Sequence, residues 1–172
     1  MKTLQIENIS RILINKKELE TKLKVELDLK ANNLVIKGDS LDEYIAERVI
    51  QAIELGFSTK TALILLDEDY MLETISIKDL SKKNPRVIRA RIIGTKRKTL
   101  DTIEEISNCD IVLHDNTIGV IGHSDDIKGA MQALMNLVKG TKPANVYSYL
   151  EKLNARKLPF VLSLKKKKTK EE

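Results

Sequence analysis

The stretch RIIGTKRKTLDTIEEI, Arg91 to Ile106, decides the fold because it joins a helix break to a basic loop. Apolar residues lead into Gly94, and three consecutive cations follow shortly after it. Leu100, Ile103 and Ile106 then recur at a helical spacing, which predicts a helix with one apolar face. Since glycine permits a sharp change of direction, we expect two helices joined by a short basic loop.

The charge around this loop favours a phosphate ligand. A helix that begins at such a break directs free N–H groups and the positive end of its dipole outward. Positions 80–100 contain no acidic residue. The cations in this span are Lys82, Lys83, Arg86, Arg89, Arg91, Lys96, Arg97 and Lys98. A basic run is also typical of a solvated surface, but its position at a helix break favours phosphate or RNA binding.

The composition of the whole chain sets looser limits. Its 172 residues are 42% hydrophobic and only 3% aromatic, which predicts an aliphatic core. The net charge of +5 is by itself a weak indication of nucleic-acid binding. Cys109 is the single cysteine, which excludes an internal disulfide and fits a reducing compartment. The N-terminus lacks a signal-peptide core and the longest apolar run is far too short to cross a bilayer, so we expect a cytoplasmic protein with no membrane contact.

Two parts of the chain resemble each other. Gly38 and Gly56 lie 18 positions apart, as do Gly122 and Gly140, and each pair bounds a helical pattern. RILINKKE at 11–18 resembles RIIGTKRK, with an offset of 91 − 11 = 80, whereas the glycines are offset by 122 − 38 = 84. The first copy is therefore expected to lack about one helical turn between its loop and its strands.

Each copy predicts a strand, a helix, a loop, a second helix, two strands and a long helix. This order indicates an α+β fold. The polar, proline-containing segment SKKNPR, Ser81 to Arg86, predicts the boundary between them. We thus expect a first domain with a linking helix at 1–82, a second domain with a C-terminal helix at 83–158, and a disordered basic tail at 159–172.

The order of elements, with a G-x-x-G loop between the first two helices, resembles that of type I KH domains, β-α-α-β-β-α. In that family the loop clamps the backbone of about four nucleotides while the bases enter an apolar groove. Gly94 matches the first loop glycine. Arg97 replaces the second, which either keeps the RNA backbone farther away or substitutes a charge contact. The resemblance thus implies two tandem KH domains, each with a three-stranded antiparallel sheet and helices on one face. In the first copy Asn15 and Glu18 replace both glycines, which implies that the first domain is a poor clamp.

The chain as a whole resembles the Partner of NOB family of small-subunit ribosome assembly proteins, including its archaeal two-KH members. The segments that carry this resemblance are Gly56–Leu80 and Val138–Lys157, the latter with its VYSYLE helix. The resemblance implies binding to the 3′-end region of small-subunit rRNA, beside an rRNA-processing endonuclease, and contact with the alpha subunit of translation initiation factor two. The alternative is a protein adaptor whose KH folds dock these proteins, with incidental RNA contact.

The resemblance also implies which residues bind RNA. They are Arg89, Arg91, Ile92, Gly94, Thr95, Lys96, Arg97 and Lys98. Within this set positions 94–97 form the loop, Ile92 supports the base groove together with Ile93, and the two arginines flank it. Ile93 fits a place in the core equally well.

The remaining polar residues indicate no chemistry. His114, His123 and Cys109 match no zinc-binding spacing. Neither a nucleophile–histidine–acid set nor a P-loop is present, so we expect no enzyme activity, no metal and no cofactor. Lys165–Lys168 suit either nonspecific phosphate attraction or solubility.

Overall fold

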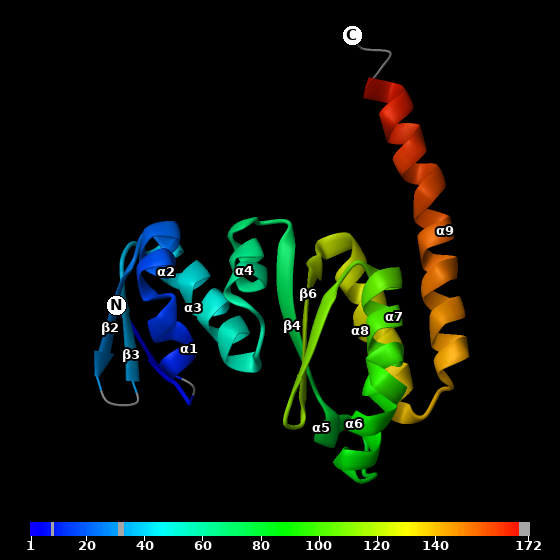
Figure 1. The fold of residues 1–172 in the computed structure, drawn as a ribbon. Coiled ribbons are helices and arrows are strands. Elements are labelled where there is room, and N and C mark those ends of the chain that lie inside the picture. Colours follow the sequence, from blue (N-terminus) through cyan, green and yellow to red (C-terminus); the bar gives the residue numbers. More distant parts are fainter. Residues whose placement is uncertain (8, 31–32, 169–172) are drawn as a thin grey trace.

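The computed structural model describes residues 1–7, 9–30 and 33–168, which form two similar units (Figure 1). The first unit contains β1 (Lys2–Gln5), α1 (Ile9–Ile14), α2 (Lys16–Leu23), β2 (Glu26–Lys30), β3 (Asn33–Lys37) and α3 (Ser40–Leu55). The second contains β4 (Tyr70–Ser76), α5 (Ile77–Leu80), α6 (Pro85–Ile93), α7 (Lys98–Ser107), β5 (Asp110–His114), β6 (Thr117–His123) and α8 (Ser124–Lys139). The units are linked by α4 (Thr59–Ala62) and a 3₁₀ turn (Leu63–Leu66), and α9 (Pro143–Lys168) follows the second unit.

Each unit has one antiparallel sheet of three strands. The strand orders are β1-β3-β2 and β4-β6-β5, so the last strand of each unit lies in the middle of its sheet. In the second sheet Thr74 of β4 and Val112 of β5 both pair with Gly119 of β6. The predicted α+β fold with two such sheets is confirmed.

The two units also share the ends of their helices. Helices α2 and α7, which precede the hairpin of each unit, end at left-handed residues, Lys24 and Asn108, and these positions are 108 − 24 = 84 apart. The long helix of each unit ends at a left-handed glycine, with φ of 108° at Gly56 and 116° at Gly140. A glycine in this conformation lets the chain turn away without a Cβ clash. The predicted repeat therefore extends to the residues that cap the helices.

The structure corrects the predicted domain boundaries. Strand β4 pairs with β6 from Tyr70 to Ser76, so the first strand of the second unit lies before the predicted boundary at 82/83. The polar segment SKKNPR instead belongs to the second unit, where it leads into α6 and supplies that helix's Asn84 cap and first-turn proline. Helix α9 continues through Lys168, so 159–168 of the tail predicted to be disordered are helical, and 169–172 lie outside the described residues.

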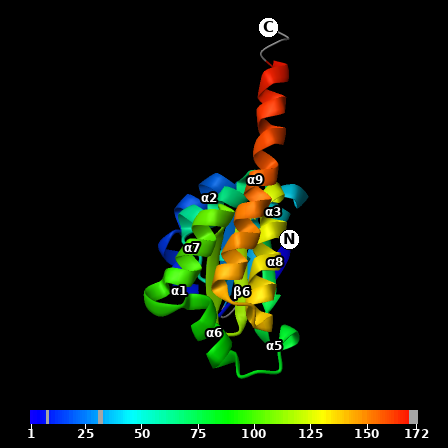
Figure 2. The same ribbon diagram turned by 90° about the vertical axis from the view of Figure 1, so that its right-hand side faces the viewer.

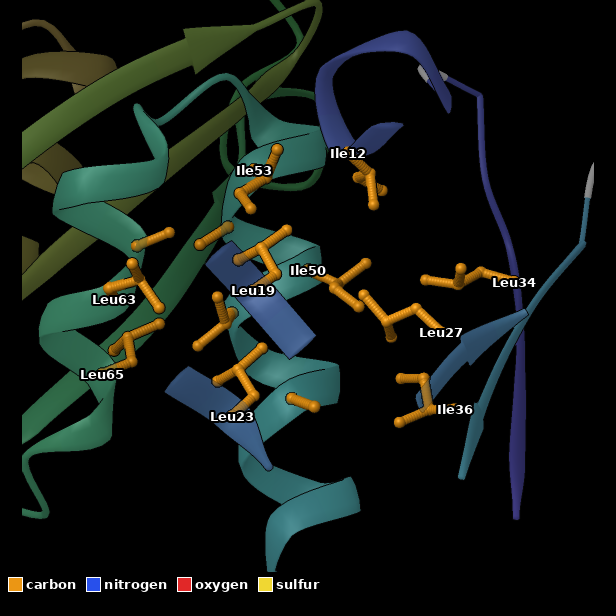
Figure 3. Close-up of a cluster of buried hydrophobic side chains, with 14 of the residues drawn as sticks. Ile12, Leu19, Leu23, Leu27, Leu34, Ile36, Ile50, Ile53, Leu63 and Leu65 are labelled. Atoms are coloured by element: carbon orange, nitrogen blue, oxygen red, sulfur yellow. The ribbon is translucent and has the colours of Figure 1, made fainter. Parts of the chain in front are cut away.

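The core of the first unit is aliphatic, as the composition predicted. Side chains from α1, α2 and α3 converge on the inner face of β2 and β3 (Figure 3). Ile12, Leu19, Leu27, Leu34 and Ile50 are fully buried there. Burial of such side chains contributes roughly 1.5–3 kcal/mol each, and it fixes α1 and α2 against the sheet.

The second sheet is covered on both faces. Ile118 and Val120 of β6 point into the core beneath α6, α7 and α8, whereas Ile121 joins the core of the first unit. A Cβ built on Gly119 would lie only 3.0 Å from Cε2 of Phe57, the residue that follows α3 and its terminal glycine. The two units therefore share an apolar interface, in which α3 contacts β5 and β6 and the 3₁₀ turn after α4 contacts β4.

Candidate nucleic-acid interface

The loop between α6 and α7 has the sharp break that the sequence predicted. Helix α6 ends at Ile93, and Gly94 adopts φ 72° and ψ 177°, a conformation essentially restricted to glycine. One 3₁₀ turn follows, in which Lys96 and Arg97 also have positive φ, at 51° and 65°. The chain thus changes direction within four residues before α7 begins at Lys98.

Thr99 explains in part why this loop needs a glycine. A Cβ built on Gly94 would lie 2.2 Å from Oγ1 and 2.7 Å from Cβ of Thr99. Thr99 is itself almost buried, at 9% exposure, so it cannot move aside easily. Thr99 therefore holds the loop in position, a role that the sequence pattern did not indicate.

The loop's cations differ in their surroundings. Thr95, Lys96 and Lys98 are exposed, and within the described parts of the chain neither lysine forms an ion pair with a carboxylate. Arg97 does: its Nε lies 2.6 Å from Oδ1 of Asp101, and its Nη2 lies 3.0 Å from Oε2 of Glu104. The hydrogen bond to Asp101, with support from Glu104, raises the pKa of the Arg97 guanidinium.

Arg97 was predicted to contact RNA, and the structure gives it another role. The acidic partners lie one and two turns into α7, outside the acid-free span at 80–100. Glu104 also accepts the backbone N–H of Ile111 through Oε1, at 2.9 Å. Arg97 therefore ties the loop to α7 and β5 and does not present an unneutralised charge.

A shallow groove of about 330 Å³ runs beside the loop-bearing helix. It is lined by Arg86, Arg89, Ala90, Ile93, Leu113 and Asp115. The α6 residues form one wall, and β5 with the tight β5–β6 turn forms the other. Nη1 of Arg89 donates to the carbonyl oxygen of Asp115 at 3.0 Å, so this predicted site residue flanks the groove and braces it.

The two isoleucines at the end of α6 lie in different places, although both were predicted to support the groove. Ile92, predicted to support the groove, is 0% exposed and lies in the core beneath α6, α7 and α8. Ile93, predicted either to support the groove or to lie in the core, is 38% exposed and lines the groove. The reason is the helical period, since Ile93 shares a face with Arg86, Arg89 and Ala90 while Ile92 faces the opposite way.

Arg91 was also predicted to flank the groove, and it lies elsewhere. Its Nη1 would be 3.3 Å from a Cβ built on Gly140, at the C-terminal end of α8. Arg11 has the same relation to Gly56 in the first unit, at 3.5 Å. The carbonyl end of a helix attracts cations, so this arginine has a structural role in both units.

The first unit has no counterpart of the loop. Ile14 is followed by the single residue Asn15 before α2 begins at Lys16. Positions up to 14 are offset by 80 from the second unit and those from 15 onward by 84, so the missing residues correspond to 95–98. The four-residue loss therefore removes the loop itself, and not a helical turn beyond it as predicted.

The residues at this junction are occupied within the first unit. Nδ2 of Asn15 donates to Oγ1 of Thr59 at 2.9 Å, and Glu18 lies inside α2 with a 3.1 Å ion pair to Lys22. The expectation that Asn15 and Glu18 stand in for two loop glycines is thus wrong, because no loop remains for them to occupy.

Three further features bear on the kind of protein. Among the described residues there is no group of three His, Cys, Asp or Glu side chains placed to hold a metal ion. The helices of residues 9–168 include none with the length and apolar character needed to cross a bilayer. Cys109 is buried, and this burial raises the pKa of its thiol to about 11.

The break at Gly94, the two helices around it and the adjoining groove on an antiparallel sheet define a type I KH domain. Residues 71–155 match the family described as "Eukaryotic type KH-domain (KH-domain type I)". The KH domain-containing protein MJ0443 of Methanocaldococcus jannaschii is 30% identical over 145 residues, which cover 80% of this chain and 64% of that protein. The RNA-binding protein PNO1 of Oryzias latipes is 34% identical over 143 residues, or 78% of this chain and 59% of PNO1.

Solved structures extend the similarity to the first unit. Dim2p from Pyrococcus horikoshii superposes with a TM-score of 0.79 at 30% identity, over 88% of this chain and 98% of Dim2p. The aDim2p chain of an a/eIF2alpha–aDim2p–rRNA complex from the same organism superposes with a TM-score of 0.80 at 29% identity. The match covers 88% of this chain and 92% of that chain. The chain belongs to the family of PNO1 and archaeal Dim2p, as the resemblance to Partner of NOB predicted. It spans less than two thirds of each of the two curated relatives described above.

Proposed function

We propose that this protein is an RNA-binding ribosome assembly factor whose second unit binds the 3′-end region of small-subunit rRNA. The observation that carries this proposal is the loop at 94–98, which places exposed Lys96 and Lys98 at the end of an apolar-floored groove. A KH domain holds a strand's backbone at such a loop while the bases lie in the groove. The names of the relatives, which include RNA binding and an rRNA complex, support the same class of ligand.

The loop residues are proposed to contact the RNA backbone, and the groove residues are proposed to contact the bases. Lys96, Lys98 and the exposed Thr95 contact phosphates, and Gly94 supplies the turn that presents them. Ile93 and Leu113 provide an apolar floor on which bases rest. We assign no catalytic step to the protein, because binding and positioning of a strand require only these contacts.

We also propose two protein partners for this chain. The aDim2p structure contains the alpha subunit of an initiation factor, and we extend that contact to this chain. The endonuclease that trims the rRNA is expected from the family resemblance.

The binding proposal is tested by removing the two loop charges. Lys96→Gln with Lys98→Gln should weaken binding to a single-stranded RNA with the small-subunit 3′-end sequence at least tenfold, as measured by fluorescence anisotropy. Each phosphate contact contributes about 0.7 to the salt dependence of log affinity for single strands, so the slope should fall by about 1.4.

A matched control removes two charges from the first unit. Lys17 and Lys30 are exposed, and Lys17→Gln with Lys30→Gln should leave both the affinity and the slope unchanged. If the loop variant binds as tightly as the wild type at every salt concentration, the second unit does not hold RNA in the proposed way.

A second function is favoured by the first unit. Without a loop, the end of α1 exposes 50% of Leu13 and 81% of Ile14, a surface suited to a protein partner. We propose that this surface docks the initiation factor or the endonuclease. Leu13→Ser with Ile14→Ser should abolish capture of the purified partner in RNase-treated samples and leave RNA affinity intact, whereas unchanged capture would reject this role.

A further inference from the structure

A second group of cations gathers where α8 meets α9. Nη1 of Arg91 and Nζ of Lys83 would lie 3.3 Å and 3.7 Å from a Cβ built on Gly140, the residue that ends α8. Lys139 and Lys142 flank the same glycine in sequence and are both exposed. We call these four cations the α8-end cluster. None of them forms an ion pair with a carboxylate in the part of the chain that the structure describes.

The cluster has more positive charge than is needed to stabilise the end of a helix. The equivalent helix end in the first unit shows this by comparison. In the first unit Arg11 alone approaches the corresponding glycine, Gly56, at the end of α3. The positions of Lys139 and Lys142, reduced by 84, are Leu55 and Ser58. One arginine therefore suffices at this kind of helix end, and the lysines of the second unit are additional.

The two positions also differ in what they contact. A Cβ on Gly119 would lie 3.2 Å from Cδ1 of Leu55, so Leu55 packs against the second sheet. Ser58 caps α4 by accepting the N–H of Thr61 at 3.1 Å. Both residues thus have contacts within the protein, whereas Lys139 and Lys142 are exposed and form no ion pair in the described residues, so an external anion can reach them.

The cluster is continuous with the groove around the N-terminal end of α6. Arg86 lines the groove, and Lys83 lies three residues earlier in the segment that leads into the helix. Helix α6 and the α8–α9 junction lie at the same end of the second unit (Figures 1 and 2). A strand that leaves the groove past Arg86 would therefore meet Lys83 and then the rest of the cluster.

We propose that the α8-end cluster binds backbone phosphates of the same RNA strand beyond the segment held in the groove. Neighbouring like charges repel each other, and a polyanion relieves that repulsion while releasing its counterions. The bases of this second segment are not read, because contacts to phosphate carry no sequence information. The proposal rests on the proposed RNA-binding function and extends the interface to the opposite side of α6.

The test compares a short and a long RNA. A single strand of about four nucleotides fills a KH groove, and a strand three times as long would also reach the cluster. The cluster variant combines Lys139→Gln with Lys142→Ser, and the serine is the residue that the first unit has at the equivalent position. This variant should bind the long RNA at least fivefold more weakly and bind the short RNA with unchanged affinity. The salt slope for the long RNA should fall by about 1.4.

The controls separate this proposal from the binding function itself. Lys17→Gln with Lys30→Gln should change the affinity for neither RNA. The Lys96→Gln, Lys98→Gln variant should bind both RNAs more weakly. Unchanged affinity of the cluster variant for the long RNA would overturn the proposal while the loop variant still tests RNA binding. Equal weakening of both RNAs would also overturn it, since the cluster would then act on the groove segment.

Discussion

At the scale of single residues, the interface depends on an arginine that occupies a glycine's place. Arg97 stands at the second glycine of G-x-x-G, keeps the left-handed backbone at φ 65°, and is held by Asp101 and Glu104. The sequence predicted the break at Gly94, because glycine before a basic run is a local signal. It did not predict the pairing of Arg97, although the spacing of four to Asp101 on a helix was a usable indication.

The backbone of residue 97 can be probed by two substitutions that both remove its ion pairs. Arg97→Gly relieves the left-handed strain, whereas Arg97→Ala keeps it. Because that conformation costs an L-residue roughly 1–2 kcal/mol, the glycine variant should be about 1 kcal/mol more stable than the alanine variant. Urea unfolding followed by circular dichroism measures the difference, and equal midpoints would show that residue 97 bears no strain.

At the scale of elements, the two helix–helix junctions differ by one loop. The sequence predicted a four-residue difference from the offsets of 80 and 84. That difference was placed after the loop, because the sequence INKKEL resembles the loop of the second unit and conceals the missing residues. The structure locates the loss at 95–98, since Ile14 corresponds to Gly94 and Asn15 to Thr99.

This correspondence predicts that the second unit tolerates loss of its loop. Deletion of 95–98 should give a folded protein, because α1 and α2 already show that the junction closes through one residue. RNA binding should fall at least as far as in the Lys96→Gln, Lys98→Gln variant. Thermal unfolding and anisotropy measure the two properties, and a deletion variant that keeps full affinity would exclude the loop as the binding element.

At the scale of the whole molecule, the units are joined more closely than the sequence indicated. The segment Tyr70–Ser76 was assigned to the first domain, because nothing local reveals that it pairs with β6. Long-range pairing also determines that Ile121 faces the first unit. Predictions from local polarity therefore found the elements and misplaced the division between them.

Phe57 provides the test of this coupling. It is 4% exposed and packs beneath Gly119, so Phe57→Ala should lower the free energy of unfolding by about 3–5 kcal/mol. The wild type should unfold in one transition, and the variant should lose the first unit before the second. Val87→Ala, at a side chain that is 61% exposed, is the control and should change little.

The buried thiol reports which unit has opened. Cys109 lies in the second unit's core, and burial raises its pKa to about 11, so a thiol reagent at pH 8 should label it only after that unit unfolds. In the wild type, labelling should coincide with the loss of circular dichroism. Coincident curves in Phe57→Ala as well would mean that the two units still unfold together and that Phe57 is not what couples them.

The double covering of strand β6 has a practical consequence for anyone who divides this protein. A fragment that starts at Tyr70 would contain all of residues 71–155, which match the KH family. It would nevertheless expose the face of its sheet that Phe57 covers. Leu72, Val112 and Ile121 would meet water there, and such a fragment would adhere to itself. Affinities measured on it would describe aggregates, so the minimal functional piece is the pair.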